Sequence, residues 1–312
     1  MTADTLNRCH FGDCRTTMRE LAQQGLKVQT CVTSPPYFGL RDYGHDGQIG
    51  LESTPDEYVA NMVEVFRCVR DLLSDDGTLW LNLGDSYGTG TTAPRKQGAR
   101  GIGAATQEAQ DAVARVGGMA KQMLGIPWRV AFALQADGWY LRQDIIWHKP
   151  NPMPESVRDR CTKAHEYIFL LSKSASYHCD MAAIAEESVY PGDNRAERTD
   201  TRKSIDPMCM DGGSRARTGN PTGETRNKRS VWTVATKPYS GAHFATFPPE
   251  LIQPCILAGA PAGGIVLDPF FGSGTTGQVC QQLGRQWIGC ELNEDYGPLQ
   301  AERTSQQGLE YA

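Results

Sequence analysis

The sequence predicts an α/β fold built around a buried parallel sheet. Three short apolar runs are each followed by a loop of polar or small residues: Val28–Thr33, Thr78–Leu83 and Gly264–Leu267. Segments with helical periodicity, such as Pro55–Leu73 and Thr275–Leu283, separate these runs. Apolar strands that alternate with helices are typical of βαβ units, in which helices cover both faces of a parallel sheet.

The remaining elements extend the same pattern along the chain. Further strands are expected at Arg8–Phe11, Tyr140–Trp147, Tyr167–Ser172 and Gln286–Glu291, with helices near Thr16–Gln24, Ile126–Ala136 and Pro249–Ala258. Two irregular stretches interrupt it: residues 88–118 are rich in Gly, Ala, Thr and Arg, and residues 187–237 contain few aliphatic side chains. Long segments without regular structure are usually functional or disordered, so we interpret both as inserts in the α/β scaffold.

Charge is distributed unevenly between the scaffold and these inserts. The chain has 312 residues, a net charge of −5 and 39 % apolar residues, which fits one large domain, or a core with an insert, and excludes a disordered chain. Residues 195–237 carry +5 and residues 94–121 carry +3, so the remainder carries −13. A basic insert suits a polyanionic partner, although solvated loops are often charged as well.

Cysteine usage and hydropathy favour a reduced, cytoplasmic protein without a metal or a membrane partner. The ten cysteines form no Cys-x-x-Cys pair and no Cys/His cluster at zinc-ligand spacing. The first eight residues are polar, unlike a secretory signal. The longest uncharged stretch, Leu251–Leu267, contains Pro254 and Pro261 and is too interrupted for a membrane span.

A glycine-rich turn follows the apolar run at Gly264–Leu267. Gly272, Gly274 and Gly277 match the Gly-x-Gly-x-x-Gly spacing of a dinucleotide site, and Glu291 follows Gly272 by nineteen residues. The absence of a Lys-Ser/Thr pair after the last glycine excludes a Walker A loop. A carboxylate at Asp268 would repel a pyrophosphate and suits a cationic ligand, such as the amino group of an amino acid. A nicotinamide-dependent oxidoreductase and a tight turn without a ligand both remain open from this pattern.

The segment Thr33-Ser34-Pro35-Pro36-Tyr37 follows the run at Val28–Thr33. Its two prolines fix two φ angles and remove two N–H donors, so the loop is stiff and presents carbonyl oxygens. A hydroxyl, a fixed carbonyl and an aromatic ring then lie together at the end of a strand. On its own, the segment is equally explained as a rigid surface turn.

The two segments together resemble the β class of DNA amino-methyltransferases, which transfer a methyl group from S-adenosylmethionine to cytosine N4 or adenine N6. Thr-Ser-Pro-Pro-Tyr and Asp-Pro-Phe-Phe-Gly-Ser-Gly-Thr-Thr carry the resemblance, which extends from about Cys9 to Tyr296. It implies the Rossmann-like class I methyltransferase fold: a mostly parallel seven-stranded sheet, helices on both faces and a circularly permuted motif order. It also implies a catalytic part at 1–178 with a mobile loop at 88–118, a target-recognition insert at 179–240 and a cofactor-binding part at 241–312.

The resemblance also implies roles for individual residues. Ser34, Pro35, Pro36 and Tyr37 would form the catalytic loop. Asp268, Gly272 and Gly274 would line the methionine end of the cofactor, and Thr275 would cap the helix beneath it. Glu291 would bind the ribose hydroxyls, Asp13 the adenine amino group, and Phe247 would pack across the methionine part. The same match adds Cys14, Phe270 and Ser273 to the cofactor site, and Trp147–Pro152 resembles a segment near the target base.

Double-stranded DNA is the implied partner, recognised by the insert while residues 88–118 close over the substrate. The basic residues expected to contact it are Arg195, Arg198, Arg202, Lys203, Arg215, Arg217, Arg226, Lys228 and Arg229. A cognate restriction endonuclease and a second copy of the chain are further candidate partners.

The expected chemistry is direct methyl transfer to an exocyclic amine. The Ser34 hydroxyl and the Pro35 carbonyl would accept hydrogen bonds from the amine, while Tyr37 stacks on a base flipped out of the duplex. Serine at the first motif position is typical of cytosine-N4 enzymes, so cytosine is favoured and adenine N6 is the alternative. Cys255, in a Pro-Cys pair, is expected to be a buried core residue and not a nucleophile.

Two alternatives from other classes remain. A nicotinamide-dependent oxidoreductase leaves the Ser-Pro-Pro-Tyr segment without a role. A non-catalytic nucleic-acid-binding module does not require the intact residues at Ser34–Tyr37 and Asp268.

Overall fold

The computed structural model describes residues 5–41, 43–45, 47–88, 120–188, 224–236 and 247–305. The chain separates into two compact units, one formed by Met1–Asp180 with Ser230–Ala312 and the other by Met181–Arg229. The second unit lies inside the range predicted for target recognition, 179–240. The functional assignment of these parts stays a prediction.

The first unit contains a mixed sheet that has eight strands among the described residues. Their order is β1 (Arg8–Phe11), β10 (Gln286–Glu291), β9 (Ile265–Asp268), β2 (Val28–Thr33), β3 (Leu73–Leu83), β5 (His165–Ser172), β4 (Tyr140–His148) and β8 (Val231–Thr233). Strand β5 runs antiparallel to β3 and β4, and the other neighbouring pairs are parallel. This is the mostly parallel sheet expected from the sequence.

Strand β8 is an addition to the seven expected strands. It pairs with β4 through Ile146 and Val231 at the sheet edge. Trp232 is buried there and stacks with Trp80, with ring centroids 6.5 Å apart. The sequence did not predict this strand because its three residues interrupt a polar segment and show no alternation long enough to recognise.

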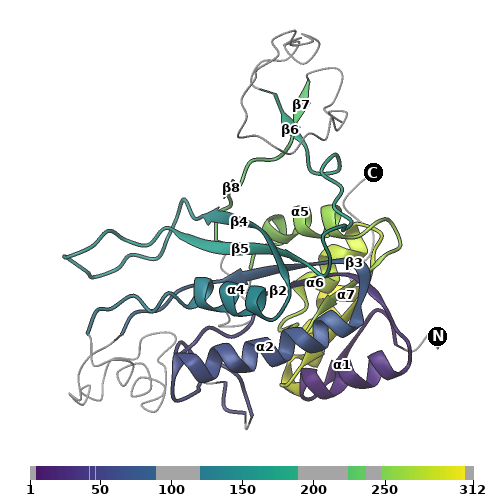
Figure 1. The fold of residues 1–312 in the computed structure, drawn as a ribbon, viewed down its shortest axis with the longest axis horizontal. Coiled ribbons are helices and arrows are strands. Elements are labelled where there is room, and N and C mark those ends of the chain that lie inside the picture. The colour runs from purple at the N-terminus through teal and green to yellow at the C-terminus, as the bar shows by residue number, and fades with distance from the viewer. Residues whose placement is uncertain are drawn as a thin grey trace, which may run out of the picture. The chain divides into compact units, whose positions relative to one another are not determined.

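Helices cover both faces of the sheet (Figure 1). Helices α1 (Cys14–Gln23), α2 (Pro55–Leu72) and α4 (Ile126–Ala136) form one layer, and α5 (Pro249–Gly259), α6 (Thr275–Gln282) and α7 (Gly297–Ser305) form the other, with the short 3₁₀ helix η2 (Glu294–Tyr296) before α7. Among the described residues, no helix is long and apolar enough to cross a membrane.

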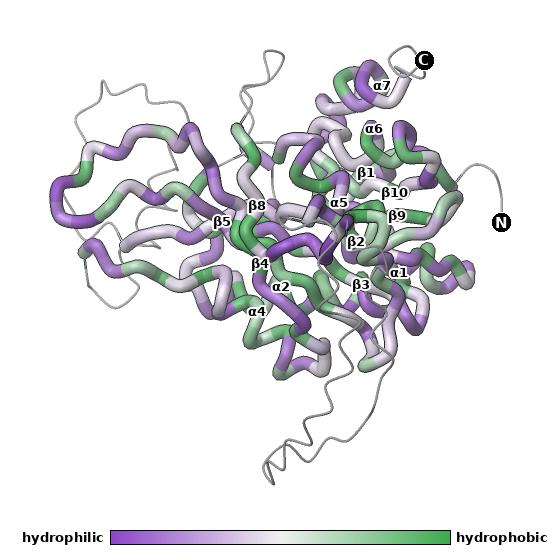
Figure 2. Tube along the Cα trace, turned by 90° about the horizontal axis from the view of Figure 1, so that it is seen from above, coloured by the Kyte–Doolittle hydropathy of each residue, from purple (hydrophilic) through white to green (hydrophobic). Residues whose placement is uncertain are grey.

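Helix α2 illustrates why the predicted helices form. The Thr54 hydroxyl accepts a hydrogen bond from the backbone N–H of Glu57 at 3.2 Å, and Pro55 occupies the first helical position. The buried side chains of Tyr58, Met62 and Val65 recur at intervals of three and four residues, so one face of the helix packs on the sheet. Figure 2 shows hydrophobic residues concentrated in the central strands, such as β9.

The second unit contains the two-stranded antiparallel pair of β6 (Glu186–Glu187) and β7 (Thr225–Arg226). Glu186 lies opposite Arg226 in this ladder. The Glu186 carboxylate accepts hydrogen bonds from the guanidinium groups of Arg226 at 2.9 Å and Arg229 at 2.6 Å.

The order of the strands creates a crevice at the carboxyl ends of the parallel strands. From β9 the chain passes through α6 to β10 on one side, whereas from β2 it passes through α2 to β3 on the other. The loops that follow two adjacent strands therefore diverge, which is the topological switch point where α/β proteins bind ligands. Because β5 runs the opposite way, its first residues, His165 and Glu166, lie at the same edge.

Candidate active site

A cavity of about 810 Å³ lies along this carboxyl edge of the sheet. Its walls contain the four predicted catalytic residues, Ser34, Pro35, Pro36 and Tyr37, and seven of the predicted cofactor residues, Asp13, Cys14, Phe247, Phe270, Gly272, Ser273 and Glu291. The Thr33 hydroxyl donates a hydrogen bond to Asp268 Oδ1 at 2.6 Å, joining the ends of β2 and β9 although the residues are 235 positions apart. The fold thus brings the two sequence motifs into one cavity.

The Ser-Pro-Pro-Tyr loop is held by contacts on several sides. The Tyr58 hydroxyl donates a hydrogen bond to the Pro36 carbonyl at 2.9 Å. A Cβ atom on Gly84 would lie 2.5 Å from Tyr37 Cε2, so only glycine lets the ring approach this closely. The stiffness that the prolines give to this loop is therefore reinforced by its surroundings.

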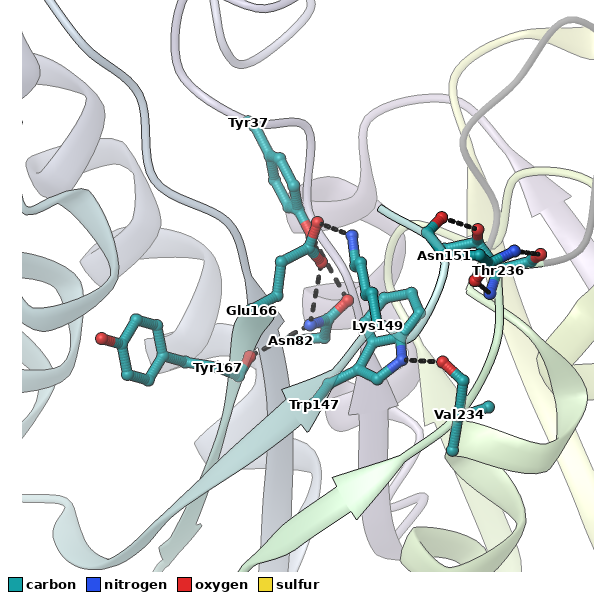
Figure 3. Close-up of polar contacts among 9 residues, drawn as sticks. All are labelled: Tyr37, Asn82, Trp147, Lys149, Asn151, Glu166, Tyr167, Val234 and Thr236. Atoms are coloured by element: carbon teal, nitrogen blue, oxygen red, sulfur yellow. Dashed lines mark hydrogen bonds and ion pairs between the residues drawn. The ribbon is translucent and has the colours of Figure 1, made fainter. Parts of the chain in front are cut away.

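The Tyr37 hydroxyl is anchored to a polar cluster on the cavity wall (Figure 3). It donates a hydrogen bond to Glu166 Oε2 at 2.8 Å and lies 3.3 Å from Asn82 Oδ1. The Lys149 ammonium forms an ion pair with the other oxygen of Glu166 and lies 4.2 Å from the centroid of the Trp147 ring. Burial raises the pKa of Tyr37 well above its usual range, so the phenol remains a hydrogen-bond donor.

The Trp147–Pro152 segment also lies on the cavity wall, as its resemblance implied. Trp147 Nε1 donates a hydrogen bond to the Val234 carbonyl at 2.8 Å. Asn151 exchanges two hydrogen bonds with the backbone of Thr236, at 2.9 and 3.0 Å. The residues that follow β8 therefore hold this segment in place (Figure 3). Glu166 was missed by sequence reasoning, because a lone acid at the start of an apolar strand shows no motif.

The glycine turn after β9 fits a ligand-binding role. Gly272 and Gly274 have φ angles of 52° and 89°, in the left-handed region that favours glycine. The backbone N–H of Gly272 donates to Glu291 Oε2 at 2.8 Å. The Ser273 hydroxyl is buried and has no hydrogen-bond partner among the residues that the structure describes, although Ser273 lines the cavity. A buried polar group without a partner is costly, so this hydroxyl suits a bound polar ligand.

Asp268 lies beneath the turn and does not line the cavity. Its carboxylate accepts hydrogen bonds from the Thr33 and Thr276 hydroxyls, each at 2.6 Å, and from the Phe270 N–H at 3.1 Å. Burial raises its pKa to about 6, against the opposing effect of these donors. Asp268 therefore organises the turn, and its direct contact with a cofactor stays a prediction.

Two further predicted residues differ from expectation. The capping role predicted for Thr275 is wrong: Gly274 is the N-cap of α6, no side chain caps the helix, and the Thr275 hydroxyl accepts a hydrogen bond from Arg303. Glycine is favoured there because the chain adopts a left-handed conformation before the helix. Neither Gly274 nor Thr275 lines the cavity.

The two acids at the far end of the cavity are held differently. Asp13 caps α1 by accepting a hydrogen bond from the Arg15 N–H at 2.8 Å, and its ion pair with the Arg15 guanidinium at 2.6 Å lowers its pKa. Glu291 accepts a hydrogen bond from the Asn293 N–H at 2.9 Å in addition to that from Gly272. Burial raises the pKa of Glu291.

The remaining predictions fall partly outside the described residues. Arg195, Arg198, Arg202, Lys203, Arg215 and Arg217 lie outside them, as does the predicted mobile loop apart from Gly88. Arg226, Lys228 and Arg229 lie in the second unit, and their contact with DNA stays a prediction. Cys255 is buried within α5, as expected. Within the part of the chain that the structure describes, no group of three His, Cys, Asp or Glu side chains could hold a metal ion.

The fold and the cavity at its switch point define a class I methyltransferase, with the Ser-Pro-Pro-Tyr loop ahead of the glycine turn in the chain. Residues 28–302 match the family described as DNA methylase, whose members modify the N6 or N4 amine of a base. The chain therefore belongs to the N6/N4 DNA methylases and is an S-adenosylmethionine-dependent DNA methyltransferase. This membership confirms the resemblance to the β class and excludes the oxidoreductase and the non-catalytic binding module as alternatives.

Similar proteins cover nearly the whole chain. The type II methyltransferase M.SmaI of Serratia marcescens is 46 % identical over 293 residues, covering 94 % of this chain and 88 % of its own. M.XycI of Xanthomonas campestris pv. cyanopsidis is 47 % identical over 296 residues, covering 95 % and 87 %. Among solved structures, the PvuII DNA methyltransferase (cytosine-N4-specific) has a TM-score of 0.61 at 18 % identity, covering 97 % of this chain and 87 % of that one. The complex of M1.HpyAVI with S-adenosylmethionine has a TM-score of 0.54 at 18 % identity, covering 95 % and 98 %.

Proposed function

We propose that this DNA methyltransferase modifies the N4 amine of cytosine in double-stranded DNA. The observation that carries the proposal is Ser34, a hydroxyl at the first position of the catalytic loop, where the family's adenine enzymes typically have Asp or Asn. Ser34 and the Pro35 carbonyl belong to the same stiff loop on the cavity wall. Adenine N6 is the second candidate, because a hydroxyl and a carbonyl can accept hydrogen bonds from either amine.

Hydrogen-bond acceptors address the main chemical obstacle of the reaction. The lone pair of an exocyclic amine is delocalised into the base, so the nitrogen is a poor nucleophile. Acceptance of the two amine hydrogens by Ser34 Oγ and the Pro35 carbonyl favours a pyramidal nitrogen with a directed lone pair. Tyr37 would provide an aromatic face for the flipped base.

The other end of the cavity has the donor and acceptor set that a nucleoside with an amino-acid tail requires. S-adenosylmethionine supplies an electrophilic methyl group on a sulfonium centre when bound. Glu291 would accept hydrogen bonds from the ribose hydroxyls, Asp13 would contact the adenine amino group, and Phe247 and Phe270 would pack against the apolar parts. The Ser273 hydroxyl, which has no partner among the described residues, would hydrogen-bond the ligand.

Nucleoside mass spectrometry tests the base assignment without knowledge of the recognition sequence. Genomic DNA free of amino-methylation is incubated with S-adenosylmethionine and the purified protein, hydrolysed, and analysed for modified nucleosides, with Ser34→Ala as the control. N4-methylcytosine is the expected product. N6-methyladenine would replace the proposal with the alternative, and neither base from a folded, cofactor-bound protein would refute both.

The biological setting forms the rest of the proposal. M.SmaI and M.XycI are named type II methyltransferases, which supports a role in a restriction-modification system with a cognate endonuclease that reads the same sequence. Residues 179–240 would read that sequence. A homodimer and a cytoplasmic location stay predictions, which sedimentation and cell fractionation would test.

A further inference from the structure

A charged pair outside the two sequence motifs lies against the catalytic loop. Glu166 is the second residue of β5, and Lys149 directly follows β4. The antiparallel register places Trp147 opposite Glu166, so the hairpin between these strands delivers both charges to the cavity wall. Lys149 belongs to the segment Trp147–Pro152 that resembles one near the target base, but the resemblance gives neither Lys149 nor Glu166 an individual role in the reaction.

Both charged side chains are largely buried, which is energetically unfavourable for an ion pair. The side chains of Lys149 and Glu166 retain only 18 % and 16 % of their exposed surface. Removing two charges from water is unfavourable, and their attraction offsets this only with good geometry and further hydrogen bonds. A buried ion pair therefore adds little net stability. Its presence here is better explained by a need to hold a neighbouring group in place.

The position that the pair controls is that of Tyr37. One Glu166 oxygen binds Lys149, and the other accepts the Tyr37 hydroxyl at 2.8 Å (Figure 3). The ring of Tyr37 is packed against Gly84 with no room for a methyl group between them. Because Pro35 and Pro36 make the segment stiff, a displacement of Tyr37 would be transmitted to Ser34 and the Pro35 carbonyl.

We propose that Glu166, paired with Lys149, is a positioning residue for methyl transfer: through the Tyr37 hydroxyl it holds the catalytic loop in the geometry that orients the target amine. The inference rests on the proposed role of this loop, for either base. It predicts that Glu166 affects the rate of the bound complex and not the affinity for the cofactor, whose proposed binding residues, such as Glu291 and Ser273, are not hydrogen-bonded to Glu166.

A double-mutant cycle tests the proposal by measuring kcat, and KM for DNA and for S-adenosylmethionine, in Glu166→Ala, Tyr37→Phe and the double variant. A displacement of about 1 Å can cost roughly 100-fold in rate, so we expect kcat of Glu166→Ala to fall by about that factor with the cofactor KM nearly unchanged. In the Tyr37→Phe background the same substitution should have almost no further effect, because the connecting hydroxyl is absent. Glu166→Gln should recover part of the rate, since its amide oxygen can still accept from Tyr37.

Asp137→Asn is the matched control, because Asp137 forms an ion pair with Arg67 between α2 and the end of α4, outside the cavity. Its kcat should equal that of the unmodified protein.

The inference would be overturned if Glu166→Ala left kcat unchanged, or if the kcat losses of Glu166→Ala and Tyr37→Phe multiplied independently in the double variant. If Glu166→Ala does not fold, Glu166→Gln carries the test, and an unchanged kcat there with an increased cofactor KM refutes a positioning role. An unmodified protein that binds cofactor but methylates no DNA would instead refute the proposed function.

Discussion

Replacing Asp268 with asparagine should stabilise the protein at neutral and alkaline pH. The carboxylate is 1 % exposed and its charge is not balanced by a cation among its hydrogen-bond partners, which are two hydroxyls and one backbone N–H. Asparagine has the same shape and an amide oxygen that can accept some of these bonds, and the threonine hydroxyls can rotate to accept from its amide. The substitution thus removes a buried charge and keeps most of the local structure.

The magnitude follows from the change in the pKa of Asp268. Burial raises this pKa from its ordinary value of 3.8 to about 6. The folded protein then binds the proton more tightly than the unfolded chain, so the free energy of unfolding decreases as pH rises through this interval and is constant above it. The full effect is about 3 kcal/mol, since each pKa step corresponds to about 1.4 kcal/mol.

Urea denaturation at pH 5 and pH 8, without cofactor, measures this effect. Comparing the variant with the unmodified protein at each pH cancels the titration of all other groups. The advantage of Asp268→Asn should be larger at pH 8 than at pH 5 by about 1 kcal/mol, because part of the penalty is already present at pH 5. Asp13→Asn is a control without this pH dependence: Arg15 lowers the pKa of Asp13 below its ordinary value of 3.8, so its contribution is fully present at both pH values and the stability difference for that substitution should be the same at pH 5 and pH 8.

A stability difference between Asp268→Asn and the unmodified protein that does not change with pH would refute this reasoning. It would mean that Asp268 titrates equally in the folded and unfolded chains, and that its hydrogen bonds fully compensate its burial. A difference that decreases from pH 5 to pH 8 would reverse the sign and show that the donors dominate.

Three further outcomes are expected. Ser34→Ala and Tyr37→Ala should each lower methylation of duplex DNA by about 100-fold or more while binding of S-adenosylmethionine is retained, and full rates in a tritiated-methyl assay would contradict the role of the loop. Gly84→Ala should lower kcat by about tenfold, because its Cβ would lie 2.5 Å from Tyr37 Cε2 and displace the ring; steady-state kinetics with an unchanged kcat would show that the ring position is immaterial. DNA affinity should fall steeply with salt, by a logarithmic slope of about −0.9 for each phosphate neutralised, and a salt-independent affinity in a filter-binding titration would remove the basic insert from the interface.

Most strands of the sheet could be predicted from the sequence because each is long enough to show a recognisable group of apolar residues. The run Val28–Thr33 has three apolar residues among six, and Ser34 and Pro35 directly after it make its end visible. Strand β8 was not predictable for the opposite reason. Its three residues pair with β4 and bury Trp232, and this stabilisation depends on a neighbour that is distant in sequence.

The sequence predicted the parts of the candidate site in which the backbone requires proline or glycine. It did not predict the part that depends on one ordinary side chain. The prolines after Thr33 and the glycines after Asp268 are recognisable because few other residues fit those φ angles. Glu166 has no such mark: it is one acid beside a strand, and only the antiparallel register of β4 and β5 places it under Tyr37. Asp268 shows the converse, since its motif was recognised but its partners were not. The Thr33 and Thr276 hydroxyls hold it beneath the turn, so Asp268 shapes the backbone of the turn, whereas its contact with a ligand stays a prediction.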